Sequence, residues 1–133
     1  MKNVILIFSV LILLGCHLVS ATPAEQKNPK IGESFEMKVG ESVTIGDEHL
    51  SFQFDSVPED SRCPRGRVCI WAGNAVVVLK FPDGKEPLNT CSELHEIIKG
   101  AYKIALLSLS PYPDGAYPIP QDSYVAQLVV NRN

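Results

Sequence analysis

The sequence lacks the residue patterns by which most enzymes and metalloproteins are recognised. No CxxC, HxH or HExxH spacing occurs, and there are no oxyanion loop, paired catalytic carboxylates or phosphate-binding glycines. The nearest approach to catalytic chemistry is Cys91 with His95 four residues later, a spacing that would place a nucleophile and a base on one helical face. Such pairs commonly arise without catalysis. We therefore expect a non-enzymatic protein with no metal and no cofactor.

Strong charge bias and long apolar runs are also missing. The 133 residues carry 12 basic and 15 acidic side chains, a formal net charge of −3, which gives no reason to expect nucleic acid binding. The longest apolar run, Val4 to Leu14, is shorter than the roughly 20 residues that a membrane-spanning helix needs. There is no internal repeat and no low-complexity segment. One ordinary domain is expected.

The N-terminal residues have the features of an export signal. Lys2 precedes the apolar run, and two cleavage sites compete after it. The residues Leu13-Leu14-Gly15-Cys16 look like a lipobox, in which Cys16 is lipidated and becomes the mature N-terminus. Val19-Ser20-Ala21 instead suits ordinary cleavage after Ala21. We favour the lipobox because the apolar run ends at Cys16, and either cleavage takes the chain out of the cytoplasm.

The remaining chain divides into a tether and one β domain. Residues 22–32 are polar with two prolines, which predicts a flexible tether. Residues 33–133 contain short runs of alternating apolar residues separated by turn residues, the pattern of half-buried strands. Residues 75–81 are apolar on both faces near their middle, as in a central strand. About seven strands at spacings near ten residues predict an antiparallel β-sandwich with an immunoglobulin-like arrangement.

A short helix competes with a strand in one place, residues 91–99. Thr90 and Glu93 have the spacing of a capping box, and Leu94 and Ile97 would share one helical face. An edge strand suits the same residues equally well. After a further strand, residues 111–120 are too rich in proline to pair in a sheet and predict a surface loop.

Three cysteines remain if Cys16 is lipidated or removed. Exported chains of this size normally pair their cysteines, so one bridge and one free thiol are expected. Loop-closure entropy is about 2 kcal/mol for Cys63–Cys69 and about 3.5 kcal/mol for either pairing with Cys91, which does not decide among them. Pro64 and Gly66 lie between Cys63 and Cys69 and favour a compact turn. We therefore favour Cys63–Cys69, leaving Cys91 as a buried free thiol.

Three of the four arginines and the only tryptophan surround this cysteine pair. Arg65 and Arg67 lie between the cysteines, and Arg62 lies just outside them. In the simpler interpretation Asp60 caps the loop or pairs with Arg62, and the other arginines are solvated. In the functional interpretation the three arginines form a binding loop, with Arg65 held outward as in small protease inhibitors. Trp71 is expected to fill the sandwich core beside the disulfide.

The stretch DSRCPRGRVCIWAG resembles a group of small bacterial secreted proteins and lipoproteins that carry a DSRCP-x-x-x-x-C-x-W-A-G pattern. The residues that carry the resemblance are Asp60, Ser61, Arg62, Cys63, Pro64, Cys69, Trp71, Ala72 and Gly73. The resemblance implies export, a frequent lipid anchor and pairing of the two motif cysteines. It implies no activity, and Cys91 lies outside the motif.

Taken together, these features predict an exported β-sandwich anchored to a bacterial cell envelope through a lipid on Cys16, or alternatively secreted or periplasmic. We expect it to act as a binding or interaction module for a protein or another envelope component. A protease inhibitor using the Cys63–Cys69 loop is the main alternative, and a metal-binding protein is a weaker one.

Overall fold

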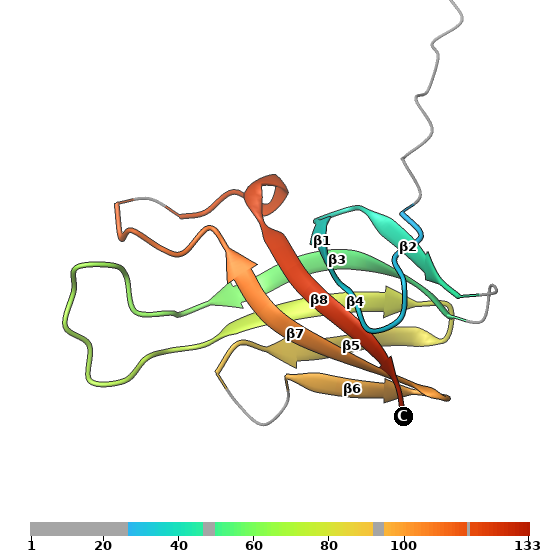
Figure 1. The fold of residues 1–133 in the computed structure, drawn as a ribbon. Helices are drawn as coiled ribbons and strands as arrows, with labels where there is room; N and C mark the ends of the chain where they lie inside the picture. The colour runs from blue at the N-terminus through green and yellow to red at the C-terminus, as the bar shows by residue number, and fades with distance from the viewer. Residues whose placement is uncertain (1–26, 47–49, 92–94, 117) are drawn as a thin grey trace, which may run out of the picture.

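Alternating apolar residues form the strands that the sequence predicts, in a computed structural model that describes residues 27–46, 50–91, 95–116 and 118–133 (Figure 1). The strands in these ranges are β1 (Ser34–Lys38), β2 (Ser42–Ile45), β3 (Leu50–Asp60), β4 (Ala75–Phe81), β5 (Gly84–Asn89), β6 (Glu96–Lys99), β7 (Tyr102–Ser110) and β8 (Val125–Arg132). A single turn of 3-10 helix, η1 (Gln121–Ser123), precedes β8. Within the described ranges no helix is long and apolar enough to cross a membrane.

The strands form two four-stranded antiparallel sheets, which confirms the predicted β-sandwich. One sheet has the order β1-β8-β7-β6 and the other the order β2-β3-β4-β5. In one sheet β2 to β5 therefore lie side by side in sequence order, and in the other β6, β7 and β8 do the same, with β1 beside β8. An immunoglobulin domain instead places strands ABED in one sheet and CFG in the other. The immunoglobulin-like order is not observed; tight turns after β4 and β6 instead place β5 beside β4 and β7 beside β6.

The core lies between the sheets and is formed by the alternating residues identified in the sequence. On β3, Leu50, Phe52 and Phe54 are buried, and β4 lies between β3 and β5 as predicted for a central strand. The rings of Phe52 and Phe81 lie 5.4 Å apart between centroids. The opposite sheet contributes buried residues of β7 and β8: Ile104, Leu106, Leu109, Ala126, Leu128 and Val130.

The segment that could have been a helix contains an edge strand. Residues 92–94 lie outside the described residues, but Glu96–Lys99 form β6 and pair with β7. Ile97 is partly buried against the core, whereas the adjacent Ile98 is 59% exposed, which is the two-residue alternation of a strand. A two-turn helix is marginal by itself, so the ladder of hydrogen bonds to β7 decides the outcome.

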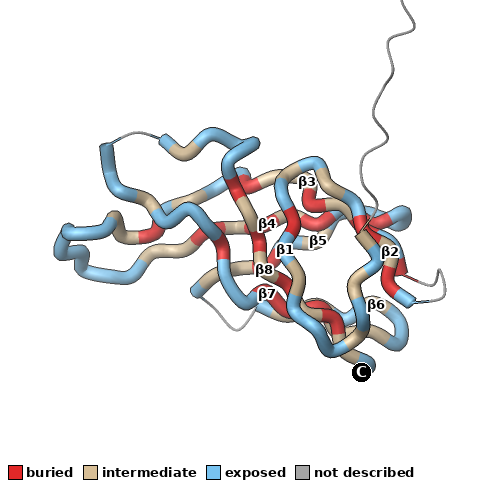
Figure 2. Tube along the Cα trace, turned by 45° about the horizontal axis from the view of Figure 1, so that its top comes forward, coloured by how far each residue is buried: buried red, intermediate tan, exposed pale blue. Residues whose placement is uncertain are grey.

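Two long loops extend from one end of the sandwich. Residues 61–74 connect β3 to β4 and residues 111–120 connect β7 to η1, and Figure 1 shows both projecting beyond the strands. Figure 2 shows these loops as largely exposed. Lys27, the first described residue, forms a bridge with Val43 of β2, which is paired with Phe52. Phe52 lies eight residues before the end of β3, so Lys27 is roughly 25 Å from the loops.

Candidate functional site

The base of the 61–74 loop continues the pairing of β3 and β4. The Ser61 backbone N–H donates to the Asn74 carbonyl at 2.7 Å, and the Cys63 N–H donates to the Ala72 carbonyl at 2.8 Å. The Ser61 hydroxyl also donates to the Asn74 carbonyl at 3.0 Å. The two arms of the loop are therefore held side by side as far as Cys63 and Ala72. Only residues beyond this point are free of the ladder.

A disulfide closes the end of the loop and confirms the predicted pairing of Cys63 with Cys69. The two Cα atoms lie 6.0 Å apart. Between the cysteines the Arg67 N–H donates to the Pro64 carbonyl at 3.2 Å, and Gly66 has a φ of +75°. Pro64 and Gly66 thus form the compact turn expected from the sequence. Disulfides persist in oxidising compartments, so this bond indicates an environment outside the cytoplasm.

Gly73 allows the two arms to approach. Its φ is +73°, and a Cβ built on it would lie 1.8 Å from the Ser61 carbonyl oxygen. Any larger residue would push the arms apart at the point where Cys63 pairs with Ala72. Glycine is therefore required here both by the backbone angle and by the space available.

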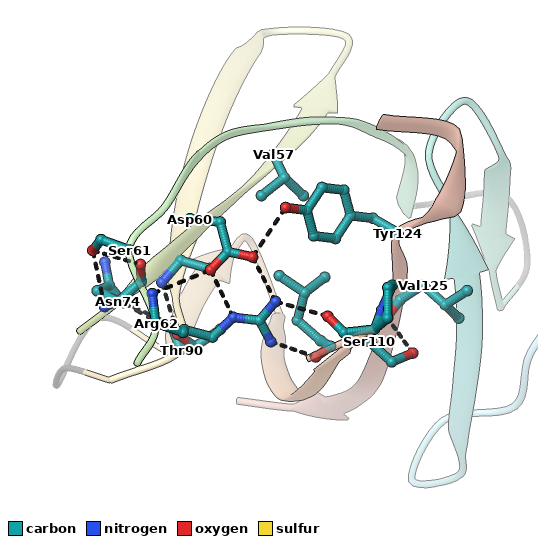
Figure 3. Close-up of polar contacts among 12 residues, drawn as sticks. Val57, Asp60, Ser61, Arg62, Asn74, Thr90, Ser110, Tyr124 and Val125 are labelled. Atoms are coloured by element: carbon teal, nitrogen blue, oxygen red, sulfur yellow. Dashed lines mark hydrogen bonds and ion pairs between the residues drawn. The ribbon is translucent and has the colours of Figure 1, made fainter. Parts of the chain in front are cut away.

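The loop is fixed to the opposite sheet by a buried ion pair. The Arg62 guanidinium donates from Nε to Asp60 Oδ1 at 2.8 Å and from Nη2 to Asp60 Oδ2 at 2.6 Å, and its side chain is only 5% exposed. Arg62 also donates to the carbonyls of Leu109 at 2.7 Å and Pro111 at 2.9 Å. Figure 3 shows Tyr124 completing this network, with its hydroxyl donating to Asp60 at 2.9 Å. Arg62 therefore joins the end of β3 to the end of β7.

The network changes the titration of both of its acidic groups. Burial by itself would raise the pKa of Asp60, but the hydrogen bonds from Arg62 and Tyr124 outweigh it and lower that pKa below 3.8. Burial and the hydrogen bond to Asp60 together raise the pKa of Tyr124 to about 12. Asp60 is consequently held as a carboxylate and Tyr124 as a neutral phenol. Their paired hydrogen bonds satisfy the polar groups that the fold has taken out of water.

Asn74 connects the loop to the end of β5. Its amide nitrogen donates to Asn89 Oδ1 at 2.7 Å, and its Oδ1 accepts the backbone N–H groups of Thr90 at 3.0 Å and Cys91 at 3.1 Å. The sequence shows Asn74 only as a polar residue before an apolar strand. The contact that explains it lies 15 to 17 positions further along the chain, so sequence reasoning missed it.

The 111–120 loop supports the disulfide ring from one side. The Arg65 N–H donates to the Pro113 carbonyl at 3.0 Å. The Tyr112 ring lies against both Arg62 and Arg65, whose guanidinium carbons are 4.9 Å and 5.7 Å from its centroid. A Cβ on Gly115 would lie 3.0 Å from Pro64, which shows how closely the loops approach. The ring is therefore supported by two independent segments.

The three arginines of the predicted binding loop have different environments. Arg62 is buried and binds Asp60, as the simpler interpretation expected, so it is not presented to a partner. Arg65 and Arg67 are exposed. The guanidinium of Arg65 nevertheless lies over Tyr112 and does not project freely outward. The structure therefore brings Arg65 and Arg67 together on the ring and separates Arg62 from them.

Apolar side chains dominate the end of the loop, residues 65–71, which we call the tip. Val68 is 103% exposed, Ile70 is 104% exposed and Trp71 is 82% exposed. The prediction that Trp71 fills the core is wrong. Trp71 lies beyond the last paired residues of the loop, Cys63 and Ala72, and the core is closed without it by residues such as Phe54 and Leu109. The tip thus exposes three large apolar side chains next to two arginines.

The free thiol lies beside this surface. Cys91 is exposed, so the prediction of a buried thiol is wrong; it follows β5 at the edge of the sheet, where its backbone N–H donates to Asn74 Oδ1. An open hollow of about 430 Å³ is lined by Trp71, Cys91 and the base of the loop. His95 is followed directly by β6, and its carbonyl accepts the Leu106 N–H at 2.8 Å.

The described ranges contain no group of three or more histidine, cysteine or acidic residues that could hold a metal ion. Residues 1–26, including Cys16, and the histidine at position 49 lie outside those ranges. No protein-family model, curated protein or solved structure matches the chain.

We predict that Asp60→Asn lowers the free energy of unfolding by about 3–5 kcal/mol, because it leaves Arg62 buried without its counter-charge. Glu59→Gln, which changes an exposed neighbour, should change it by less than about 0.5 kcal/mol. Urea unfolding of the three proteins measures both. The pKa of Asp60 is lower in the folded protein than in the unfolded chain. The carboxylate therefore contributes to the free energy of unfolding above pH 3.8, and this contribution is lost as the pH falls through the lowered pKa. Two results would contradict the role of the pair. One is an equal loss of unfolding free energy in Asp60→Asn and Glu59→Gln. The other is a difference in unfolding free energy between wild type and Asp60→Asn that stays the same in acid.

Two glycines of the loop provide a matched test of the steric argument. Gly66 and Gly73 have φ values of +75° and +73°, but a Cβ on Gly66 meets nothing within 4 Å. Gly66→Ala should cost about 1–2 kcal/mol from the backbone angle alone. Gly73→Ala should cost more than about 3 kcal/mol, because its Cβ also collides with Ser61. Urea unfolding followed by circular dichroism compares them, and similar losses would show that the arms are not in close contact.

Proposed function

We propose that this protein is an exported binding module of a bacterial cell envelope and that the tip is its contact surface. The observation that carries the proposal is the high exposure of Val68, Ile70 and Trp71 on one loop. Monomeric soluble proteins rarely leave clustered large apolar side chains exposed unless they bind something there. Each such side chain gains about 1.5–3 kcal/mol when it is fully buried. Contact with a partner would supply that burial.

The way the tip is held supports a binding role. Its two arms are paired up to Cys63 and Ala72, the disulfide closes it, and the Arg65 backbone binds the neighbouring loop. A loop that is already ordered loses little conformational entropy on binding. The disulfide and the backbone hydrogen bonds therefore hold in place Val68, Ile70 and Trp71, which do not pack in the core.

The position of the tether suits this proposal. Lys27 joins β2 roughly 25 Å from the end of β3, and the tip lies beyond that end, so the tip does not compete with the tether for space. In the same proposal Cys16 carries a lipid, and residues 17–26 connect it to the domain. The arrangement leaves the tip accessible while the chain is attached to a membrane.

The protease-inhibitor alternative gains no support from the ring. Such an inhibitor would present Arg65 outward to a specificity pocket, whereas its guanidinium lies over Tyr112. The most exposed large apolar residues of the ring and its flank are Val68 and Ile70. We therefore assign the binding role to the apolar residues of the tip rather than to its arginines.

A photoreactive amino acid placed at position 70 should cross-link to a partner, protein or lipid, in the native envelope. The same amino acid at position 98 is the matched control, because Ile98 is also an exposed isoleucine but lies on β6. Labelling at position 70 alone is the expected result. No adduct at position 70, or equal adducts at both positions, would contradict a contact surface at the tip.

The lipid anchor has its own test, which is the mass of the mature protein. We expect a chain that begins at Cys16 and carries acyl groups, and we expect Cys16→Ala to release the protein from the membrane fraction. A mature chain that begins at Thr22 without acyl groups would show that the signal is cleaved after Ala21. That result would leave the binding role of the tip unaffected.

A further inference from the structure

We propose that the partner of the tip is an anionic lipid bilayer, into whose headgroup region Val68, Ile70 and Trp71 insert. This inference rests on the proposed binding role of the tip and specifies its partner. The first observation behind it is the degree of exposure. Val68 and Ile70 exceed 100% relative exposure, so neither side chain rests on a neighbouring surface. A fluid bilayer receives projecting side chains of any shape and needs no complementary pocket.

The composition of the tip matches the boundary between lipid and water. The aliphatic side chains of Val68 and Ile70 suit the upper acyl region, and the ring of Trp71 combines an apolar body with a polar N–H, which favours the headgroup level. Arg65 and Arg67 have long apolar stems that allow their charged ends to stay in the headgroup layer. Backbone groups of a loop cannot be satisfied in the hydrocarbon centre, so the insertion is shallow.

The charge of the tip is opposite to that of the whole chain. The chain has 15 acidic and 12 basic residues, but residues 63–71 contain two arginines and no acid. Of the acids nearest along the chain and in the facing loop, Asp60 is neutralised by Arg62, while Glu59 and Asp114 lie outside residues 63–71, at the end of β3 and in the facing loop. A basic tip on an acidic protein directs that end toward an anionic surface and turns the rest away.

The support of the tip is suited to insertion. The disulfide and the hydrogen bond from Arg65 to Pro113 keep the three apolar side chains on one end of the molecule before any contact is made. If Cys16 is lipidated, the eleven residues from there to Lys27 extend up to about 36–40 Å. That length is comparable with the roughly 36 Å from Lys27 to Cys63, eleven residues beyond Phe52 along β3 and its continuation, so the tip meets the membrane that holds the anchor when the tether is nearly extended.

Trp71 provides a direct measurement, because it is the only tryptophan in the chain. We would add vesicles of phosphatidylcholine with phosphatidylglycerol, or of phosphatidylcholine alone, to the full chain with its disulfide intact. Binding should shift Trp71 emission to shorter wavelength, and brominated lipids should quench it on the anionic vesicles. The signal comes from the tip, so the apolar N-terminal segment does not produce it.

Three variants keep this reporter and separate the contributions. Ile70→Ser should weaken partitioning about tenfold through lost apolar contact. Arg67→Ala should weaken it about fivefold on anionic vesicles only. Ile98→Ser is the matched control and should leave it unchanged, since Ile98 is 59% exposed on β6. Circular dichroism confirms that each variant is folded.

Several outcomes would overturn the bilayer proposal: no shift on either vesicle, equal shifts on both, or equal effects of Ile70→Ser and Ile98→Ser. If vesicles give no shift but position 70 still cross-links to one envelope protein, the partner is a protein and the binding role of the tip stands. If neither vesicles nor the envelope engage position 70, both proposals fail together.

Discussion

The buried pairing of Arg62 with Asp60 is the interaction on which this end of the molecule depends. It connects the last residue of β3 to the carbonyls of Leu109 and Pro111, and through the carboxylate to Tyr124 before β8. A second polar contact joins β3 to η1 near this end, because the Gln121 side chain donates to the Val57 carbonyl at 2.7 Å and accepts the Val57 N–H at 2.9 Å. Removing either charge would leave the other buried, which is far more costly than never having buried the pair. This contact joins the base of the 61–74 loop to the start of the 111–120 loop.

The rest of the loop is arranged in layers above that contact. Ser61 with Asn74 and Cys63 with Ala72 continue the strand ladder, Gly73 allows the arms to meet, and the disulfide closes the ring. Each of these residues has a structural role in holding the loop. Val68, Ile70 and Trp71 at the tip have no such role, because they contribute nothing to the core. The loop is held in a fixed conformation, yet it exposes apolar side chains that pack against nothing in the core. This combination is the physical reason for assigning the loop a binding role.

Sequence reasoning succeeded where the relevant contacts are local. Alternation located the core residues of β3, β4 and β8, and the turn residues between Cys63 and Cys69 indicated the disulfide. It failed for Trp71 and Cys91, which were expected inside the protein. A tryptophan or a cysteine is usually buried, but burial depends on whether the backbone passes the core at that residue. The paired arms of the 61–74 loop place Trp71 away from the core, and no local sequence pattern indicates this position.

By itself, the sequence determined the fold class, the strand positions and the region of the disulfide, because two-residue periodicity and turn chemistry act within a few residues. Only the tertiary structure decided which unusual residues are structural and which are presented to a partner. Arg62 turns inward because Asp60 and the carbonyls of β7 meet it there, while Trp71 turns outward because nothing does. The bonds from Arg62 to Leu109 and from Tyr124 to Asp60 join residues 47 and 64 positions apart in the chain, so they exist only once the two sheets are assembled.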